Sequence, residues 1–224
     1  MDRVPEIEEP MRIGTKSVLF GAHCFFIHPW FVAWGWWKLY GFPMSLPIWV
    51  SFFVHDLGYL GKPNMDGPEG ETHVLLGARI MGALFDNPYH RTAESELGPS
   101  TGKWHRFAVF HSRFWAKQFD EPVSRLCFAD KMAIAITPWW LYLPLVTLSG
   151  ELQEYIALST PNSKYAWMSI DHHNKREWYE NMQRYLLAWI QKHKDGRPDT
   201  WTPSNAVQSD PSPQNKGASC NRQS

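Results

Sequence analysis

The sequence has too little cysteine for a disulfide framework or a cysteine-ligated zinc site. Its three cysteines, Cys24, Cys127 and Cys220, are odd in number and far apart, and none belongs to a CxxC pair. An excess of charge is also missing, because 22 lysine and arginine residues balance 22 aspartate and glutamate residues. The chain lacks the electrostatic signature of a nucleic-acid-binding protein, so we expect no nucleic-acid partner.

A secretory signal is not expected, because the first residues, MDRVPEIEEPM, are acidic and contain no apolar core. Two apolar stretches, 18–54 and 132–148, could be taken for membrane spans, and the second approaches the ~20 residues that span a bilayer. Pro138 and Pro144 interrupt the second, the first contains ionisable residues such as Lys38, and the mean hydropathy of the chain is -0.39. We interpret both stretches as buried core helices and expect no stable membrane insertion, with shallow membrane association as the lesser alternative. Cytoplasmic localisation is the default expectation.

Alternation typical of β-strands is absent over any useful length, and there is no internal repeat. Helical spacing of apolar residues instead predicts an all-α fold, and 224 residues suit one domain. Pro29 should kink or split the first helix, and a last helix should follow Asp171 as its N-cap. The other predicted helices begin after Ser45, Gly70, Gly102, Asp120 and Pro138, so that the whole set covers 15–40, 45–60, 71–85, 103–119, 121–136, a segment after 138, and a segment after 171.

Two polar regions interrupt or follow these helices. The segment 86–102 connects two of them, and it is either a plain connection or a lid over a site, of which we favour the lid. From Asp195 onward the chain is rich in Pro, Ser, Asn and Gln and has few apolar residues, a composition typical of disorder. The predicted organisation is therefore a helical domain over 1–194 and a disordered tail over 195–224.

The stretch FFVHD, residues 52–56, places a histidine and an aspartate directly after an apolar run. Buried ionisable groups are costly unless they are paired or bind a metal. Imidazole and carboxylate suit divalent iron, manganese, zinc or cobalt, and a helical bundle can build such a site from facing helices. The nitrogen and oxygen ligands offered by successive predicted helices are His23, His55, Asp56, His73, His111 and Asp130.

The order H…HD…H…H…D, over residues 21–137, resembles the HD-domain superfamily of metal-dependent phosphohydrolases. The likeness is closest across HDLGYLGKPNMDG and EGETHVLLGARIM, which are similar to an HD-GYP-type region, and ADKMAIAIT resembles the family's last ligand stretch. The resemblance implies an HD-domain-like helical bundle holding one or two divalent ions: Mn, Fe, Co, Zn or Mg. It also implies the ligands, with His23, His55, Asp56 and Asp130 on one metal and Asp56 bridging to a second metal held by His73 and His111.

Two positions depart from the family pattern. Tyr59 stands where the family has a lysine, which removes a cation near the substrate phosphate. Ser112 and Arg113 follow His111 in place of the GYP signature, so cleavage of cyclic-di-GMP is not supported. Arg113, Lys62 or Lys131 could replace the missing charge.

The resemblance implies hydrolysis of a small phosphate ester, with a nucleotide as the leading candidate. A bound metal would activate a water near Asp56, and Arg113 could contact the phosphate. Glu69, Glu71 or His105 could transfer protons. Two alternatives stay open: a mixed-valence di-iron oxygenase of the myo-inositol oxygenase type on the same ligands, and a non-catalytic helical binding module.

The remaining aromatic and imidazole side chains are interpreted as structural. Core or surface positions are expected for His28, His90, His105, His172, His173 and His193. Tryptophan side chains bury much area and keep one N–H donor. Those at 34, 36, 37, 139 and 140 are therefore assigned to the core and its polar rim, with a base-stacking pocket as the alternative.

Overall fold

The computed structural model describes residues 11–86, 102–159 and 173–195. Within these ranges all regular structure is helical and no strand is present, which confirms the all-α prediction for this part of the chain. The elements are α1 (Ile13–Phe20), α2 (His28–Tyr40), α3 (Leu46–Val54), η1 (Leu57–Tyr59), η2 (Gly70–His73), α4 (Val74–Phe85), α5 (Lys103–Val109), α6 (Arg113–Gln118), α7 (Arg125–Ile136), α8 (Trp139–Ser149), α9 (Glu151–Leu158) and α10 (Lys175–His193).

The segment predicted as one helix over 15–40 forms two helices, α1 and α2. Pro29 lies in the first turn of α2, where its missing N–H breaks no helical hydrogen bond. The break itself begins at Gly21, which packs so closely on Glu151 that a Cβ atom would lie 2.2 Å from Oε2 of that glutamate. A tertiary contact therefore sets this boundary.

Other boundaries also differ from the sequence-based expectation. The predicted helix over 103–119 is divided into α5 and α6, and Ser112 caps α6 by accepting the N–H of Trp115 at 3.4 Å. The final helix begins after Asn174, whose side chain accepts the N–H of Glu177 at 3.0 Å. The predicted cap at Asp171 lies outside the described residues, as do most of the 86–102 connection and nearly all of the tail.

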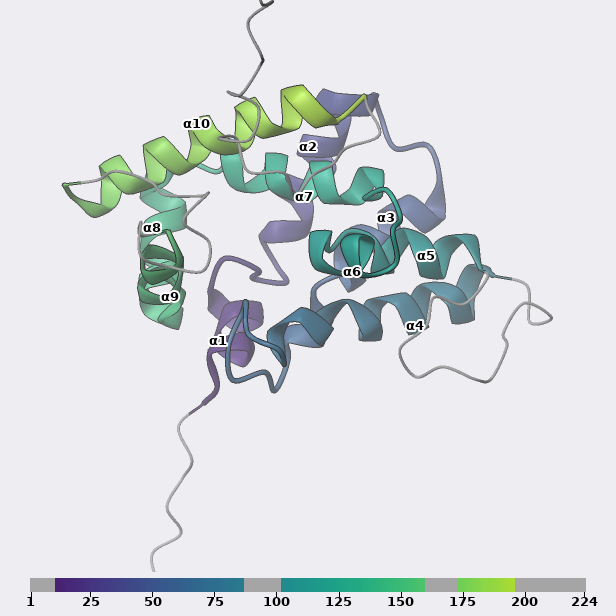
Figure 1. Ribbon diagram of the computed structural model, residues 1–224, viewed down its shortest axis with the longest axis horizontal. Coiled ribbons are helices and arrows are strands. Elements are labelled where there is room, and N and C mark those ends of the chain that lie inside the picture. The colour runs from purple at the N-terminus through teal and green to yellow at the C-terminus, as the bar shows by residue number, and fades with distance from the viewer. Residues whose placement is uncertain (1–10, 87–101, 160–172, 196–224) are drawn as a thin grey trace, which may run out of the picture.

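Helix α7 lies at the centre of the packing and contacts both α2 and α10. Figure 1 shows α10 running along one side of the molecule beside α7, with α4 and α5 packed together on the other. At Gly35 of α2, a Cβ atom would lie 2.6 Å from the carbonyl oxygen of Ala129, so glycine allows α2 to approach α7 closely. This approach brings His28 at the start of α2 next to Asp130 of α7.

The two apolar stretches, 18–54 and 132–148, are only partly buried, since Trp37 in the first is 59% exposed and Trp140 in the second is 61% exposed. In the described part of the chain, no single helix is both long enough and apolar enough to cross a membrane. Helices α7 and α8 satisfy that condition only as a pair, and the chain bends by 104° between them.

Candidate metal centre

Histidine and aspartate side chains form two overlapping buried groups near the middle of the molecule. The first group is His28, His55, Asp56 and Asp130, and the second is Asp56, His73 and His111. One nitrogen or oxygen atom from each member lies within 4.8 Å of the corresponding atoms of the others in its group. These side chains come from α2, α7, η2 and the turns after α3 and α5, so only the folded chain assembles the groups.

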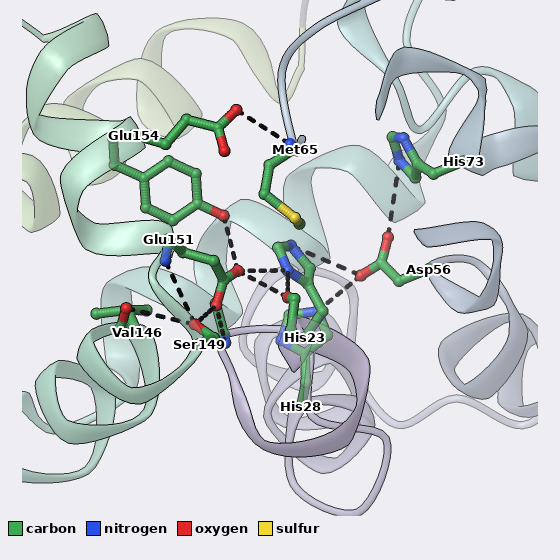
Figure 2. Close-up of polar contacts among 12 residues, drawn as sticks. His23, His28, Asp56, Met65, His73, Val146, Ser149, Glu151 and Glu154 are labelled. Atoms are coloured by element: carbon green, nitrogen blue, oxygen red, sulfur yellow. Dashed lines mark hydrogen bonds and ion pairs between the residues drawn. The ribbon is translucent and has the colours of Figure 1, made fainter. Parts of the chain in front are cut away.

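Asp56 belongs to both groups and presents one carboxylate oxygen to each. Its Oδ2 lies 2.9 Å from Nε2 of His55 and 3.3 Å from Nε2 of His28. Its Oδ1 lies 3.5 Å from Nε2 of His111 and 3.8 Å from Nε2 of His73. Figure 2 shows Asp56 placed between His28 and His73. A carboxylate in this position could bridge two cations.

Asp130 completes the first group from the opposite side. Its Oδ1 lies 3.1 Å from Nε2 of His28 and 3.9 Å from Nε2 of His55. Its Oδ2 accepts a hydrogen bond from Nζ of Lys131 at 2.9 Å. One oxygen therefore stays available to the group while the other is neutralised by the neighbouring lysine.

Several polar atoms of the first group are buried without a hydrogen-bond partner. Buried polar atoms without partners are rare in folded proteins, and each needs an explanation. They are His28 Nε2, His55 Nε2, Asp56 Oδ2 and Asp130 Oδ1, which make up the whole ligand set. Because a divalent cation among them would satisfy all of them at once, the residues present fit a metal ion.

Backbone contacts fix the orientation of three of the imidazole rings. Each ring holds its Nδ1 near the carbonyl oxygen of the residue three positions earlier, and a carbonyl can only accept. In the neutral ring Nδ1 therefore carries the proton, and Nε2 is left to turn a lone pair toward the group, as metal-binding histidines require. The Nδ1 to oxygen distances are 3.1 Å for His55 to Phe52, 2.7 Å for His73 to Gly70 and 2.5 Å for His111 to Ala108.

The second group brings two imidazole nitrogens unusually close. Nε2 of His73 lies 3.2 Å from Nε2 of His111, while both rings use Nδ1 toward a carbonyl. Burial and the neighbouring His111 lower the pKa of His73 to about 3, so His73 supplies no second proton near neutral pH. A cation beside the two nitrogens would offset the repulsion between their lone pairs.

The charges of the cluster also favour a cation. Burial by itself lowers the pKa of His55, but Asp56 and Asp130 outweigh it and raise that pKa to about 10. Burial by itself raises the pKa of Asp56, but His55 and His23 hold it well below its usual range. Both effects mean that positive charge is strongly attracted to this place, which is typical of functional sites.

His23, predicted as a ligand of the first metal, is not a member of either group. Its Nε2 lies 4.0 Å from Oδ2 of Asp56, while its Nδ1 lies 2.8 Å from Oγ of Ser17 and 3.3 Å from Oε1 of Glu151. Figure 2 shows His23 between Glu151 and Asp56. His28, interpreted from the sequence as structural, takes the expected place in the first group.

A cavity of about 230 Å³ opens beside the two groups. Its lining includes Asp56, Asp130, His73 and His111, together with His23. It also includes apolar and aromatic side chains, among them Ile134, Tyr142, Tyr155, Trp178, Met182 and Leu186. The cavity could therefore hold a small molecule with one polar end at the cluster.

The remaining predicted site residues lie in different places. Arg113, Lys131 and Glu71 line the cavity, whereas the described lining residues include neither Glu69 nor His105. Glu69 accepts a hydrogen bond from Asn64 at 3.1 Å, and His105 lies in the first turn of α5. Glu151, which contacts His23, was not predicted as part of the site, because it belongs to no sequence motif.

Comparison with protein-family models, with curated proteins and with solved structures finds no match for this chain. The molecule is therefore placed by its own features, as a helical protein with a buried histidine and aspartate cluster that could hold a metal ion. These features are compatible with an HD-like fold.

Proposed function

We propose that the protein is an HD-like, metal-dependent phosphohydrolase that acts on a small phosphate ester. The observation that carries the proposal is the set of buried, partnerless ligand atoms described above, two of whose residues, Asp56 and Asp130, line the cavity. The first group would hold one divalent ion and the second group another, with Asp56 shared between them. A metal bound here would lower the pKa of a bound water and polarise a phosphoryl oxygen.

His23 is the residue best placed to exchange a proton with the substrate. Ser17 and Glu151 hold its Nδ1 side, and the ring lines the cavity. Nε2 is then directed toward the cluster end, within 4.0 Å of Asp56. In the proposed reaction His23 donates a proton to the leaving oxygen. Glu69 and His105 are less suited to this role, because neither lines the cavity.

The cavity also supports a proposal about the organic part of the substrate. Tyr142, Tyr155 and Trp178 give it an aromatic wall, and aromatic rings bind apolar or planar groups well. Lys131 at the cluster end is already paired with Asp130, which leaves it less able to neutralise several phosphates. A monophosphate ester with an aromatic or planar body, such as a nucleoside monophosphate, fits this arrangement best.

The test is phosphate release from a panel of nucleotides and simple phosphate esters, carried out anaerobically with Mn²⁺ or Co²⁺. We expect turnover by the unmodified protein and none by His55→Gln, which removes a ligand from the first group. His173→Gln is the matched control, because His173 is exposed and outside both groups. Equal activity in all three proteins would contradict the proposal.

One observation favours a second candidate, a di-iron oxygenase. Tyr59 occupies the position of the family's lysine, is buried and stacks on the ring of His73 at 4.0 Å, so that part of the site offers no cation to a phosphate. Oxygen activation needs redox-active iron with an open coordination position and no such cation. Oxygen consumption by iron-loaded protein, together with an inactive ester panel, would favour this candidate over the hydrolase.

A further inference from the structure

Helix α2 and the turns at its two ends expose a row of large apolar side chains, here called the α2 face. Trp30, Trp34 and Trp37 follow one another at spacings of four and three residues, which places them on one side of the helix. The full set is Phe26, Trp30, Trp34, Trp37, Phe42, Met44 and Leu46, each more than 40% exposed. An exposed apolar surface of this size marks an interaction site more often than a chance arrangement.

The exposure of this face does not result from a poorly filled core. The opposite side of α2 contributes Val32, Ala33 and Trp36 to a buried cluster with Phe52. Two of the exposed rings also contact each other, since the ring centroids of Trp37 and Phe42 lie 6.3 Å apart. The helix thus has one side packed inside the protein and one side turned to the solvent.

The charge of this region has one sign. The sequence from Met11 to His55 contains no aspartate or glutamate. One cation stands beside the exposed rings, since Nζ of Lys38 lies 5.1 Å from the ring centre of Trp34. The α2 face therefore complements a surface that is negatively charged at its edge and apolar beneath.

We propose that the α2 face binds the surface of an anionic lipid bilayer, with α2 lying parallel to the membrane plane. Indole rings prefer the headgroup level, where their apolar body is buried and their N–H remains hydrated. Lys38 would contact lipid phosphates and carboxylates from the rim. The proposal does not depend on the chemistry of the metal centre.

The shape of the face favours a bilayer over a second copy of this chain. The most exposed side chains project from the turns at the two ends of α2, with Phe26 75% exposed and Met44 86% exposed. The 13 residues of α2 set these projections ~20 Å apart. Two separated apolar projections with aromatic rings between them can enter a soft headgroup layer together, whereas a rigid protein partner would need matching hollows.

The test is vesicle flotation with the full chain. One set of vesicles contains phosphatidylcholine and phosphatidylserine, and the other contains phosphatidylcholine alone. We expect binding to both, stronger to the mixed vesicles. The triple variant Trp30→Gln, Trp34→Gln and Trp37→Gln should lower the partition coefficient at least about tenfold. The matched control is the triple variant Leu76→Gln, Leu84→Gln and Leu187→Gln, which removes exposed apolar side chains from α4 and α10 and should bind like the unmodified protein.

Lys38→Gln provides a second variant, because Lys38 is exposed and its loss should not affect folding. It should lower binding to the mixed vesicles about fivefold and leave binding to phosphatidylcholine alone unchanged. No flotation by the unmodified protein would overturn the proposal, as would equal losses in the two triple variants. A concentration-dependent doubling of mass that Trp37→Gln abolishes, without vesicle binding, would assign the face to a second copy of the chain.

Discussion

Two buried carboxylate clusters meet at His23, and they are satisfied in different ways. Glu151, which is 0% exposed, accepts hydrogen bonds from Oγ of Ser17 at 2.7 Å, from the N–H of Ala22 at 2.9 Å and from the hydroxyl of Tyr155 at 3.1 Å. Asp56 and Asp130 instead lie against imidazole nitrogens of His28 and His55, and one oxygen of each carboxylate has no hydrogen-bond partner.

The difference shows which surroundings of a buried carboxylate favour a metal ion. Hydroxyl and amide donors can offset the cost of burying a carboxylate, as they do around Glu151. Around Asp56 the neighbouring groups are imidazole rings, and those of His55, His73 and His111 hold Nδ1 near backbone carbonyls. When these rings are neutral, only lone pairs face the carboxylate, so Asp56 attracts a positive charge. That charge is either a second proton on His55, whose pKa is raised to about 10, or a metal ion. The cluster around Glu151 is complete within the protein, whereas the cluster around Asp56 and Asp130 could be completed by a metal ion.

The largest effect should come from removing the shared ligand, with Asp56→Asn. Because one oxygen of Asp56 faces each group, both metal positions should weaken together. We expect metal affinity to fall by at least about a hundredfold, since changes to the outer partners of metal ligands alone cost 10–100-fold. Equilibrium dialysis with Mn²⁺ measures this, and unchanged stoichiometry and affinity would show that the cluster does not bind metal.

The next largest effect separates the two histidines near the boundary between the clusters. His28→Gln removes a ligand of the first group and should lower metal affinity about 10-fold or more. His23→Gln removes a residue that lines the cavity but belongs to neither group, so metal binding should persist while turnover of an active ester falls. The opposite pattern, with metal lost in His23→Gln alone, would support the predicted ligand role of His23.

A smaller effect is expected in the cluster that is already satisfied. Glu151→Gln places an amide donor among groups that donate to Glu151, and at least one buried hydrogen bond is then lost. The free energy of unfolding should fall by about 1–3 kcal/mol, and metal content should stay unchanged. Glu180→Gln, which alters an exposed ion pair on α10, is the control for a glutamate change without burial. Denaturant unfolding of metal-free proteins would contradict this expectation if both variants had the same stability.

The smallest expected effect is the change with pH in the contribution of Glu151 to stability. Burial by itself raises the pKa of Glu151, but His23 and Ser149 outweigh it and lower the pKa below the ordinary value of 4.5. The unfolded chain therefore binds the proton more readily, so the contribution of Glu151 is complete above that value and is lost as the pH falls. Between pH 6 and pH 3 (about the range set by such shifts), the stability difference between the unmodified protein and Glu151→Gln should shrink. A constant difference would exclude this role for the charge of Glu151.

The helical character of the chain could be predicted because it depends on local patterns. Pro29 in the first turn of α2 and Ser45 before α3 both lie where the sequence signals place helix starts. His55 and Asp56 could also be predicted as candidate ligands, because an apolar run next to two ionisable residues is a local feature. The HD-like assignment and the phosphohydrolase activity remain predictions.

The exchange of His23 for His28 could not be predicted, because its cause is not local. The break after α1 depends on Gly21 packing against Glu151, which is 130 residues later in the chain and carries no motif. Both histidines lie near Asp56, with His28 Nε2 at 3.3 Å and His23 Nε2 at 4.0 Å from its Oδ2, and such positions follow from long-range packing rather than from a local pattern.

The most direct test of the account is the metal content of the purified protein. Protein purified without chelators, both aerobically and anaerobically, would be loaded with Mn²⁺ or Fe²⁺, dialysed and analysed by elemental mass spectrometry. The geometry of the two groups predicts close to two ions per chain in the unmodified protein and close to one in His73→Ala, which keeps the first group intact. An unmodified protein that holds no divalent ion under saturating conditions would show that the histidine and aspartate groups do not bind metal.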